Sequence, residues 1–313
     1  MPTPHTPFTH ALVPYDGSEP ARAALTLAIA LATRGATLTV ATILDEATAI
    51  AQSASAMTAY DPTPLMDVLD DQGLALLDDA VAQCRTAKVV PGVDMVHDTP
   101  VGGILSAVVR HACDLVIMGT HARTGIARTF LGSTTEGVLR ASQVPVLTVR
   151  TVDRIDAAPL ATALVAVDDS EPADAALAVA AMLARRSETQ IVVCHAIDTA
   201  RLYQNAAAYG FAPEHIAEMR VKGTALVQRA LAHASLASDT PVAIIEGDPA
   251  IAVIVAAAER HATVIVVGTH GRRGLSRFFL GSVAEGIVRT SDIPVLVVRG
   301  KIPAFPKERR CGQ

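Results

Sequence analysis

The chain consists largely of two copies of one sequence pattern. Residues 115–150 align with residues 264–299 without a gap, and 19 of the 36 aligned positions are identical. The opening segments LVPYDGSEPARAAL and LVAVDDSEPADAAL also match each other. The period, about 150 residues, far exceeds that of a solenoid repeat, so each copy is predicted to fold as a complete domain. We expect one domain over 1–152, a second over 153–300 and a flexible tail over 301–313, and we refer to the first two as the first and second halves.

Within each half, short apolar segments alternate with segments of helical spacing. Strands that are apolar on both sides and alternate with helices are typical of a parallel sheet covered on both faces, which places the chain in the α/β class. The strands are predicted near 10–14, 36–44, 91–97, 114–119 and 145–149, and at 163–167, 189–197, 241–246, 262–268 and 293–298. Polar, less regular inserts are predicted at 45–64 and 198–212.

A glycine-rich loop follows the fourth strand of each half. It reads GTHARTGIARTFLGS from Gly119 and GTHGRRGLSRFFLGS from Gly268, and a predicted helix follows it. Open α/β sheets bind ligands at the carboxyl ends of their strands, where the strand order reverses. Glycines and a helix N-terminus there offer backbone N–H groups to an anion. Asp168, after the first strand, suits an adenine amino group or a ribose hydroxyl, so the pattern indicates an anion or nucleotide pocket.

Simpler explanations exist for single residues of the loop. Ser282 with Glu285, and Ser133 with Glu136, form the S-x-x-E pattern of a capping box, and glycines after a strand can serve only turns. The loop arginines can clamp phosphates or remain solvated, and the loop histidines fit a structural role better than acid–base catalysis. The loop also matches neither G-x-G-x-x-G nor G-x-x-x-x-G-K-[ST].

Composition argues against several other classes of protein. The net charge is −5, the pI is about 6.0 and aromatic residues make up 3% of the chain, so we expect no nucleic-acid partner. The sequence has no signal-peptide pattern, no apolar run of membrane-spanning length and no CxxC spacing among its four cysteines. We therefore expect a soluble cytoplasmic protein without a membrane partner or a metal site.

The loop resembles the ATP-binding signature of the universal stress protein family, G-x-x-G, nine residues, then G-[ST]. In the second half Gly268, Gly271, Gly281 and Ser282 complete it. The segments VDDSEPADAAL, GDPA and PVLVVR also resemble that family. The resemblance covers both halves, so the chain is similar to tandem universal stress proteins. It implies two Rossmann-like, adenine nucleotide α-hydrolase-like domains, each with a five-stranded parallel sheet of order 3-2-1-4-5.

The resemblance also implies ATP or another adenine nucleotide in the crevice, often with Mg²⁺. In the second half Val167, Asp168 and Ala196 would contact the base, and Gly268 and Gly271 the ribose and first phosphates. Phosphates would bind at Gly281, Ser282 and Val283, with Arg272 flanking the loop. The matching positions of the first half are Tyr15, Asp16, Ile43, Gly119, Gly132, Ser133 and Thr134.

The first half departs from the family pattern twice. Ala122 stands at the second glycine position, and Asp98 stands where the second half has Gly247. A methyl group and an additional carboxylate would both disfavour a polyphosphate, provided that Asp98 faces the pocket. We predict that the second half is the better nucleotide site, although Ala is small enough that the first half could still bind.

Three functions fit these features. The first is an ATP-binding regulator or sensor in a stress response, with little or no hydrolysis, because there is no Walker lysine and no evident general base. The second is a slow ATPase or hydrolase-type enzyme, for which only the inserts could supply a second substrate pocket. The third is a scaffold without a ligand. We also expect the last strands to pair within the chain, a homodimer, and an unknown regulatory protein partner.

Overall fold

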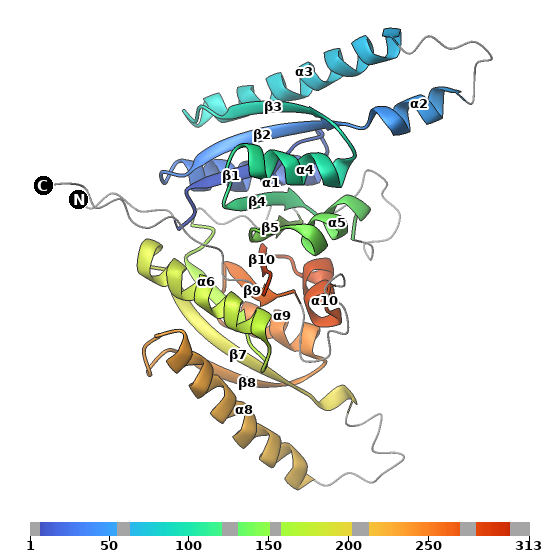
Figure 1. The fold of residues 1–313 in the computed structure, drawn as a ribbon. Coiled ribbons are helices and arrows are strands. Elements are labelled where there is room, and N and C mark those ends of the chain that lie inside the picture. Colours follow the sequence, from blue (N-terminus) through green and yellow to red (C-terminus); the bar gives the residue numbers. More distant parts are fainter. Residues whose placement is uncertain are drawn as a thin grey trace, which may run out of the picture.

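The computed structural model describes residues 7–54, 63–120, 131–150, 158–201, 213–269 and 280–300. These residues form one ten-stranded sheet with helices on both sides (Figure 1). The strands are β1 (His10–Pro14), β2 (Thr37–Leu44), β3 (Gly92–His97), β4 (Leu115–Gly119), β5 (Val146–Val149), β6 (Thr162–Ala166), β7 (Gln190–Asp198), β8 (Val242–Gly247), β9 (Val264–Gly268) and β10 (Val295–Val298). Every predicted strand is present to within about two residues.

The strand order is β3-β2-β1-β4-β5-β10-β9-β6-β7-β8. Each half therefore has the expected order 3-2-1-4-5, and all pairs within a half are parallel. The halves join where β5 pairs antiparallel with β10. Thr148 Oγ1 donates to the Val295 carbonyl at 3.1 Å across this junction. The prediction that the last strands pair within the chain is confirmed. This pairing covers the apolar edges that β5 and β10 would otherwise expose.

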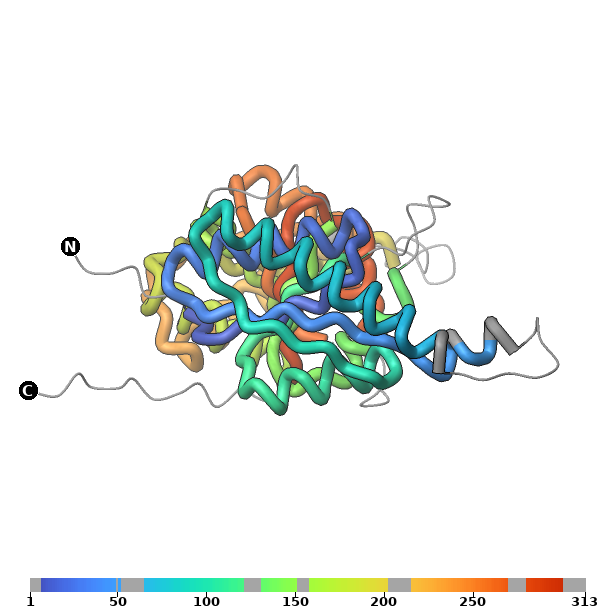
Figure 2. The backbone as a smooth tube through the Cα atoms, turned by 90° about the horizontal axis from the view of Figure 1, so that it is seen from above, coloured from blue at the N-terminus to red at the C-terminus, as the bar shows by residue number. Residues whose placement is uncertain are grey.

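Helices cover the two faces of the sheet in two sets. One set is α1 (Glu19–Ala32), α3 (Thr63–Thr86), α6 (Glu171–Ser187) and α8 (Pro213–His233); the other is α4 (Pro100–Arg110), α5 (Ser133–Ala141), α9 (Pro249–Glu259) and α10 (Ser282–Thr290). Each set buries one hydrophobic core that runs through both halves. Figure 2 shows α1 and α3 on one side of the strands and α4 on the other. Cys84, Cys113 and Cys194 lie in these cores as free thiols, and burial raises the pKa of Cys194 to about 12.

One helix was missed. The insert at 45–64 contains α2 (Glu46–Ala54), which begins directly after Asp45. Asp45 accepts hydrogen bonds from the Thr48 backbone N–H at 3.1 Å and from the Thr48 hydroxyl, and these contacts form the first turn. No helix in the described ranges is both long and apolar enough to cross a bilayer.

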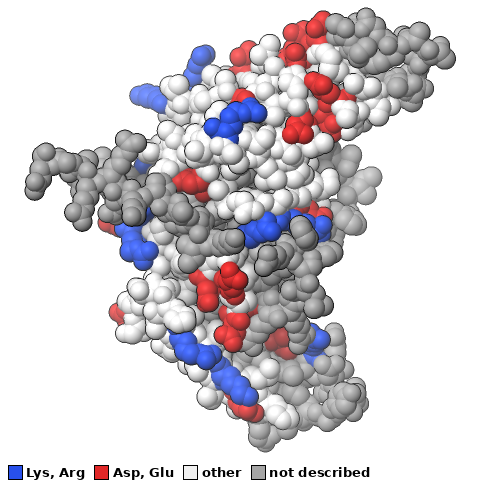
Figure 3. Space-filling model, in the orientation of Figure 1, with Lys and Arg blue, Asp and Glu red and all other residues white. Residues whose placement is uncertain are grey.

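The equivalent helices α3 and α8 differ in charge. Acidic side chains gather over α3 in Figure 3, and this helix carries five aspartates against the single cation Arg85. Helix α8 instead carries Arg220, Lys222 and Arg229. Arg220 pairs with Glu246 of β8 at 2.6 Å. The two halves thus share a fold but present different surfaces, so equal binding properties are not expected of them.

Candidate functional site

The candidate site lies at the carboxyl edge of two neighbouring strands in each half. In the second half β6 pairs with β9 in parallel, with Val165 opposite Val266. Val167 and Gly268 each lie two residues further on. The segment that follows β6 (Asp168–Ser170) and the glycine loop that follows β9 therefore leave the sheet side by side. In the first half β1 pairs with β4 in the same way. The structure therefore brings together the two segments that the sequence placed on one crevice.

The base of each loop is closed by a backbone hydrogen bond. The Gly281 N–H donates to the Thr269 carbonyl at 2.6 Å, and the Gly132 N–H donates to the Thr120 carbonyl at 3.1 Å. Residues 121–130 and 270–279 lie outside the described residues, and with them Ala122, Gly271 and Arg272. The closed base nevertheless fixes where each following helix begins.

Helices α5 and α10 begin without a capping side chain. Their N-cap residues are Gly132 and Gly281, and neither helix has a side-chain cap hydrogen bond. By contrast, Ser18, Thr99, Ser170 and Asp248 cap α1, α4, α6 and α9 with their side chains. The capping-box explanation of Ser133 and Ser282 is therefore wrong: both serines are the first helical residue, and both are exposed. The backbone N–H groups at these two helix starts lack the side-chain acceptor that α1, α4, α6 and α9 have, which suits a bound phosphate.

Gly119 and Gly268 have a packing role that the loop motif does not predict. A Cβ atom at Gly268 would lie 2.6 Å from the Pro172 carbonyl oxygen, and one at Gly119 would lie 2.6 Å from the Pro20 carbonyl oxygen. Only glycine allows the first turn of α6 or α1 to approach so closely. These glycines are explained by the fold, whatever the loop binds.

The residues after β1 and β6 are held by both backbone and side-chain hydrogen bonds. The Val167 N–H donates to the Cys194 carbonyl at 2.9 Å, and the Tyr15 N–H donates to the Ala41 carbonyl at 2.8 Å. Asp168 accepts a short hydrogen bond from the Ser170 hydroxyl. Asp16, which is exposed, accepts one from the Ser18 backbone N–H at 3.0 Å. Both carboxylates are thus fixed at the crevice by the residue that caps the next helix.

The second strand of each half supplies the remaining base-contacting candidates. Ile43 and Ala196 are half-buried and pack against the core beneath α4 and α9. Val283 and Thr134, the second helical residues of α10 and α5, are also half-buried. All predicted site residues within the described ranges therefore lie on or directly after β1, β2 and β4 or at the start of α5 in the first half, or at the equivalent places in the second half.

Comparison with known proteins accounts for this arrangement. The sequence model of the Universal stress protein family matches residues 7–150 and 161–299. The chain belongs to the universal stress protein family. The universal stress protein Rv2005c of Mycobacterium tuberculosis is 27% identical over 74% of this chain and 78% of its own length. The universal stress protein YxiE of Bacillus subtilis is 30% identical over 44% of this chain and 97% of its own length.

Solved structures share the fold of the whole chain. The universal stress protein of Archaeoglobus fulgidus covers 93% of this chain and 98% of its own, with a TM-score of 0.68 and 22% identity. PA1789 of Pseudomonas aeruginosa covers 93% and 92%, with a TM-score of 0.61 and 18% identity. These likenesses establish a tandem universal stress protein fold.

This universal stress protein differs between its halves just before α4 and α9. Gly247 has φ of +133°, which L-residues rarely adopt, whereas Asp98 has no positive φ. The Asp98 carboxylate accepts from the Thr99 N–H at 2.6 Å and from the Thr99 hydroxyl at 3.2 Å. It therefore lies at the start of α4, and the backbone at position 98 cannot follow the path that it takes at Gly247.

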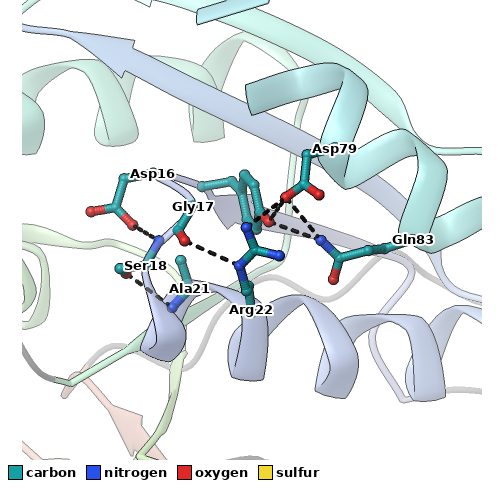
Figure 4. Close-up of polar contacts among 8 residues, drawn as sticks. Asp16, Gly17, Ser18, Ala21, Arg22, Asp79 and Gln83 are labelled. Atoms are coloured by element: carbon teal, nitrogen blue, oxygen red, sulfur yellow. Dashed lines mark hydrogen bonds and ion pairs between the residues drawn. The ribbon is translucent and has the colours of Figure 1, made fainter. Parts of the chain in front are cut away.

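A second difference is a polar cluster beneath the first site (Figure 4). Tyr15 is 2% exposed and donates a short hydrogen bond to Asp79 of α3, while Gln83 donates to the Tyr15 oxygen at 2.9 Å. Arg22 of α1 pairs with Asp79 at 3.2 Å. Burial, together with the Asp79 hydrogen bond, raises the pKa of Tyr15 to about 12. Val167 replaces this tyrosine in the second half, so α8 has no such hydrogen bond to the residue after β6. Any ligand contact of Tyr15 is through its backbone.

We expect Tyr15→Phe to lower the free energy of unfolding by about 1–2 kcal/mol, because Asp79 loses a hydrogen-bond donor. The raised pKa means that the folded state favours the neutral phenol. The stabilisation is therefore complete below pH 10 and is lost as the pH rises towards 12. Urea unfolding should show that the free energy of unfolding of wild type exceeds that of Tyr15→Phe by less at pH 11 than at pH 8. An equal difference at both pH values would contradict this role of the Tyr15 hydroxyl.

Two further residues, Thr135 and His195, hold the edge and were not predicted from the sequence. Thr135 donates to the Gly119 carbonyl at 2.8 Å and ties α5 to the end of β4; Ala284 replaces it in the second half. His195 contacts the Val167 carbonyl, as described below. Comparing the two halves position by position would have marked both. Among the described residues, no group of three or more His, Cys, Asp or Glu side chains could hold a metal ion.

Proposed function

We propose that this universal stress protein binds ATP at the carboxyl edge of β6 and β9 and acts as a nucleotide-dependent regulator or sensor in a stress response. The observation that carries the proposal is the start of α10. There the chain leaves a helix N-terminus without a side-chain cap, next to a glycine loop and across from a fixed carboxylate. The start of α10 suits an anionic group, and Asp168 suits a hydrogen-bond donor. An adenine nucleotide carries both, as its phosphates and as its amino and hydroxyl groups.

The proposed contacts combine these positions with the sequence motif, which contributes Gly271 and Arg272. The phosphates bind at Gly281, Ser282 and Val283, with Gly271 and Arg272 of the loop beside them. The base and ribose lie against Val167, Asp168, Ala196 and Gly268. Mg²⁺ would arrive with the phosphates, because this ion commonly keeps several waters and needs few protein carboxylates.

We propose that the second half is the stronger site. In the first half Asp98 adds a carboxylate at the start of α4, and Ala122 replaces a motif glycine. We expect Ala122→Gly to raise ATP binding by the first half, so that a second equivalent appears in calorimetric titration. A stoichiometry unchanged from wild type would count against the asymmetry.

The regulator is preferred to an enzyme because the loop lacks the lysine of a P-loop, and its histidines fit a structural role. The alternative, a slow ATPase or hydrolase-type enzyme, would need a second substrate pocket, which the inserts at 45–64 and 198–212 would have to supply. A homodimer, an unknown protein partner, a cytoplasmic location and a domain boundary near residue 152 stay predictions.

Calorimetric titration of the wild-type chain with ATP, combined with a phosphate-release assay, tests the proposal. We expect saturable binding with release close to background. Turnover well above background would favour the enzyme. No saturable binding by protein stripped of nucleotide would contradict the proposed function.

A further inference from the structure

The imidazole of His195 holds the carbonyl group at the end of β6. His195 lies on β7, one position beyond the residue that pairs with Ala166. Its Nδ1 atom lies 2.9 Å from the Val167 carbonyl oxygen. A carbonyl oxygen can only accept, so Nδ1 carries the hydrogen. The Val167 N–H donates to the Cys194 carbonyl, so β7 fixes both the N–H and the carbonyl group of Val167.

Helix α8 sets the position of the ring from the other side. A Cβ atom at Gly223 of α8 would lie 2.8 Å from His195 Cδ2. The glycine thus lets the helix backbone approach the imidazole closely. The half-buried ring lies between the sheet and α8. Because this packing is close, a shift of α8 would displace the ring and the Val167 carbonyl that it contacts.

The first half makes the same contact with a different residue. Thr42, the counterpart of His195, donates through Oγ1 to the Tyr15 carbonyl at 3.1 Å. A buried hydroxyl and a half-buried imidazole differ in size and shape, yet each donates to the equivalent carbonyl. The shared feature is the hydrogen bond, which points to a need for a fixed carbonyl at this edge rather than for a given packing volume.

We infer that His195 is a positioning residue of the second nucleotide site and couples that site to α8; this rests on the proposed function. A carbonyl oxygen has two lone pairs, and His195 occupies one. The other remains for an N–H donor of the ligand, such as the amino group of adenine. His195 acts through Val167, and Gly223 transmits the position of α8 to the ring.

The test compares variants of similar size that differ in the donor. His195→Asn keeps a side-chain N–H close to the position of Nδ1, whereas His195→Leu removes it. We expect the ATP dissociation constant to stay within about threefold of wild type for Asn and to rise by roughly tenfold for Leu. Gly223→Ala, which displaces the ring from α8, should also raise it by roughly tenfold. If Leu destabilises the chain, His195→Thr and His195→Val form the second matched pair, chosen because Thr42 makes the equivalent contact in the first half.

The outcomes separate the two proposals. If wild type binds ATP and His195→Asn and His195→Leu have equal ATP affinities, the positioning role alone is overturned. This holds whether both variants match wild type or both are weakened. Unchanged binding by Gly223→Ala would overturn the coupling to α8. Wild-type protein that binds no ATP would overturn the proposed function and, with it, this inference.

Discussion

Replacing Gly281 with Asp should abolish most ATP binding while making the apo protein slightly more stable. Gly281 has φ −64° and ψ 145°, so a side chain fits there without strain. Aspartate is a favoured N-cap residue and would accept from the open N–H groups of α10, adding a few tenths of a kcal/mol or more. The same carboxylate would occupy the proposed phosphate position. Repulsion of about 3–4 kcal/mol at short range corresponds to a rise in the ATP dissociation constant of about 100-fold or more.

The first half provides the matched control. Gly132 is the N-cap of α5, with φ −62° and ψ 141°, and α5 likewise has no side-chain cap. Gly132→Asp should give the same gain in stability with little change in the ATP affinity of the chain, because the first half is the weaker site. Thermal melts of apo protein and ATP titrations of both variants make the comparison. If Gly281→Asp binds ATP as tightly as wild type, the phosphates do not lie at α10.

The second large effect is expected from Gly268→Ala, which should lower the free energy of unfolding by about 2–3 kcal/mol even without nucleotide. The added methyl would meet the Pro172 backbone at 2.6 Å, and a backbone cannot move aside as a flexible side chain can. Gly119→Ala should cost a similar amount through Pro20. A glycine needed only for the ligand would instead leave apo stability unchanged.

Gly281→Ala is the control for this effect. Its backbone angles suit alanine, and losing glycine at an N-cap position costs less than about 1 kcal/mol. Chemical denaturation of the three apo variants separates the packing role of Gly268 and Gly119 from the binding role proposed for Gly281. Equal stability of Gly268→Ala and wild type would show that α6 can withdraw from β9 at little cost.

The fold was predictable because its signals are local and repeated. Most strands are short apolar runs, and nearly every run recurs at the equivalent place in the other half. The position of the glycine loop at the carboxyl edge follows from the alternation of strands and helices alone. The pairing of β5 with β10 followed from their apolar edges.

The details that distinguish the halves were not predictable, because they depend on residues far apart in the sequence. Nothing near Tyr15 indicates that its hydroxyl meets Asp79, 64 positions away. The close approach of Pro172 to Gly268 likewise exists only in the folded chain. The S-x-x-E pattern of Ser282 and Glu285 suggested a cap, but the preceding glycine takes the cap position. Helix α2 lies in a segment that reads as a polar insert, and its first turn depends on contacts seen only in the fold. In the second half residues 199–201 are also helical, and the Arg201 N–H donates to Asp198 as the Thr48 N–H does to Asp45.

Native mass spectrometry of the wild-type chain with ATP tests the central claim most directly. The proposed function predicts one adenine nucleotide per chain for wild type and for Gly132→Asp, and none for Gly281→Asp. Two nucleotides per wild-type chain would contradict the asymmetry. One nucleotide retained by Gly281→Asp and lost by Gly132→Asp would place the working site in the first half and contradict the account.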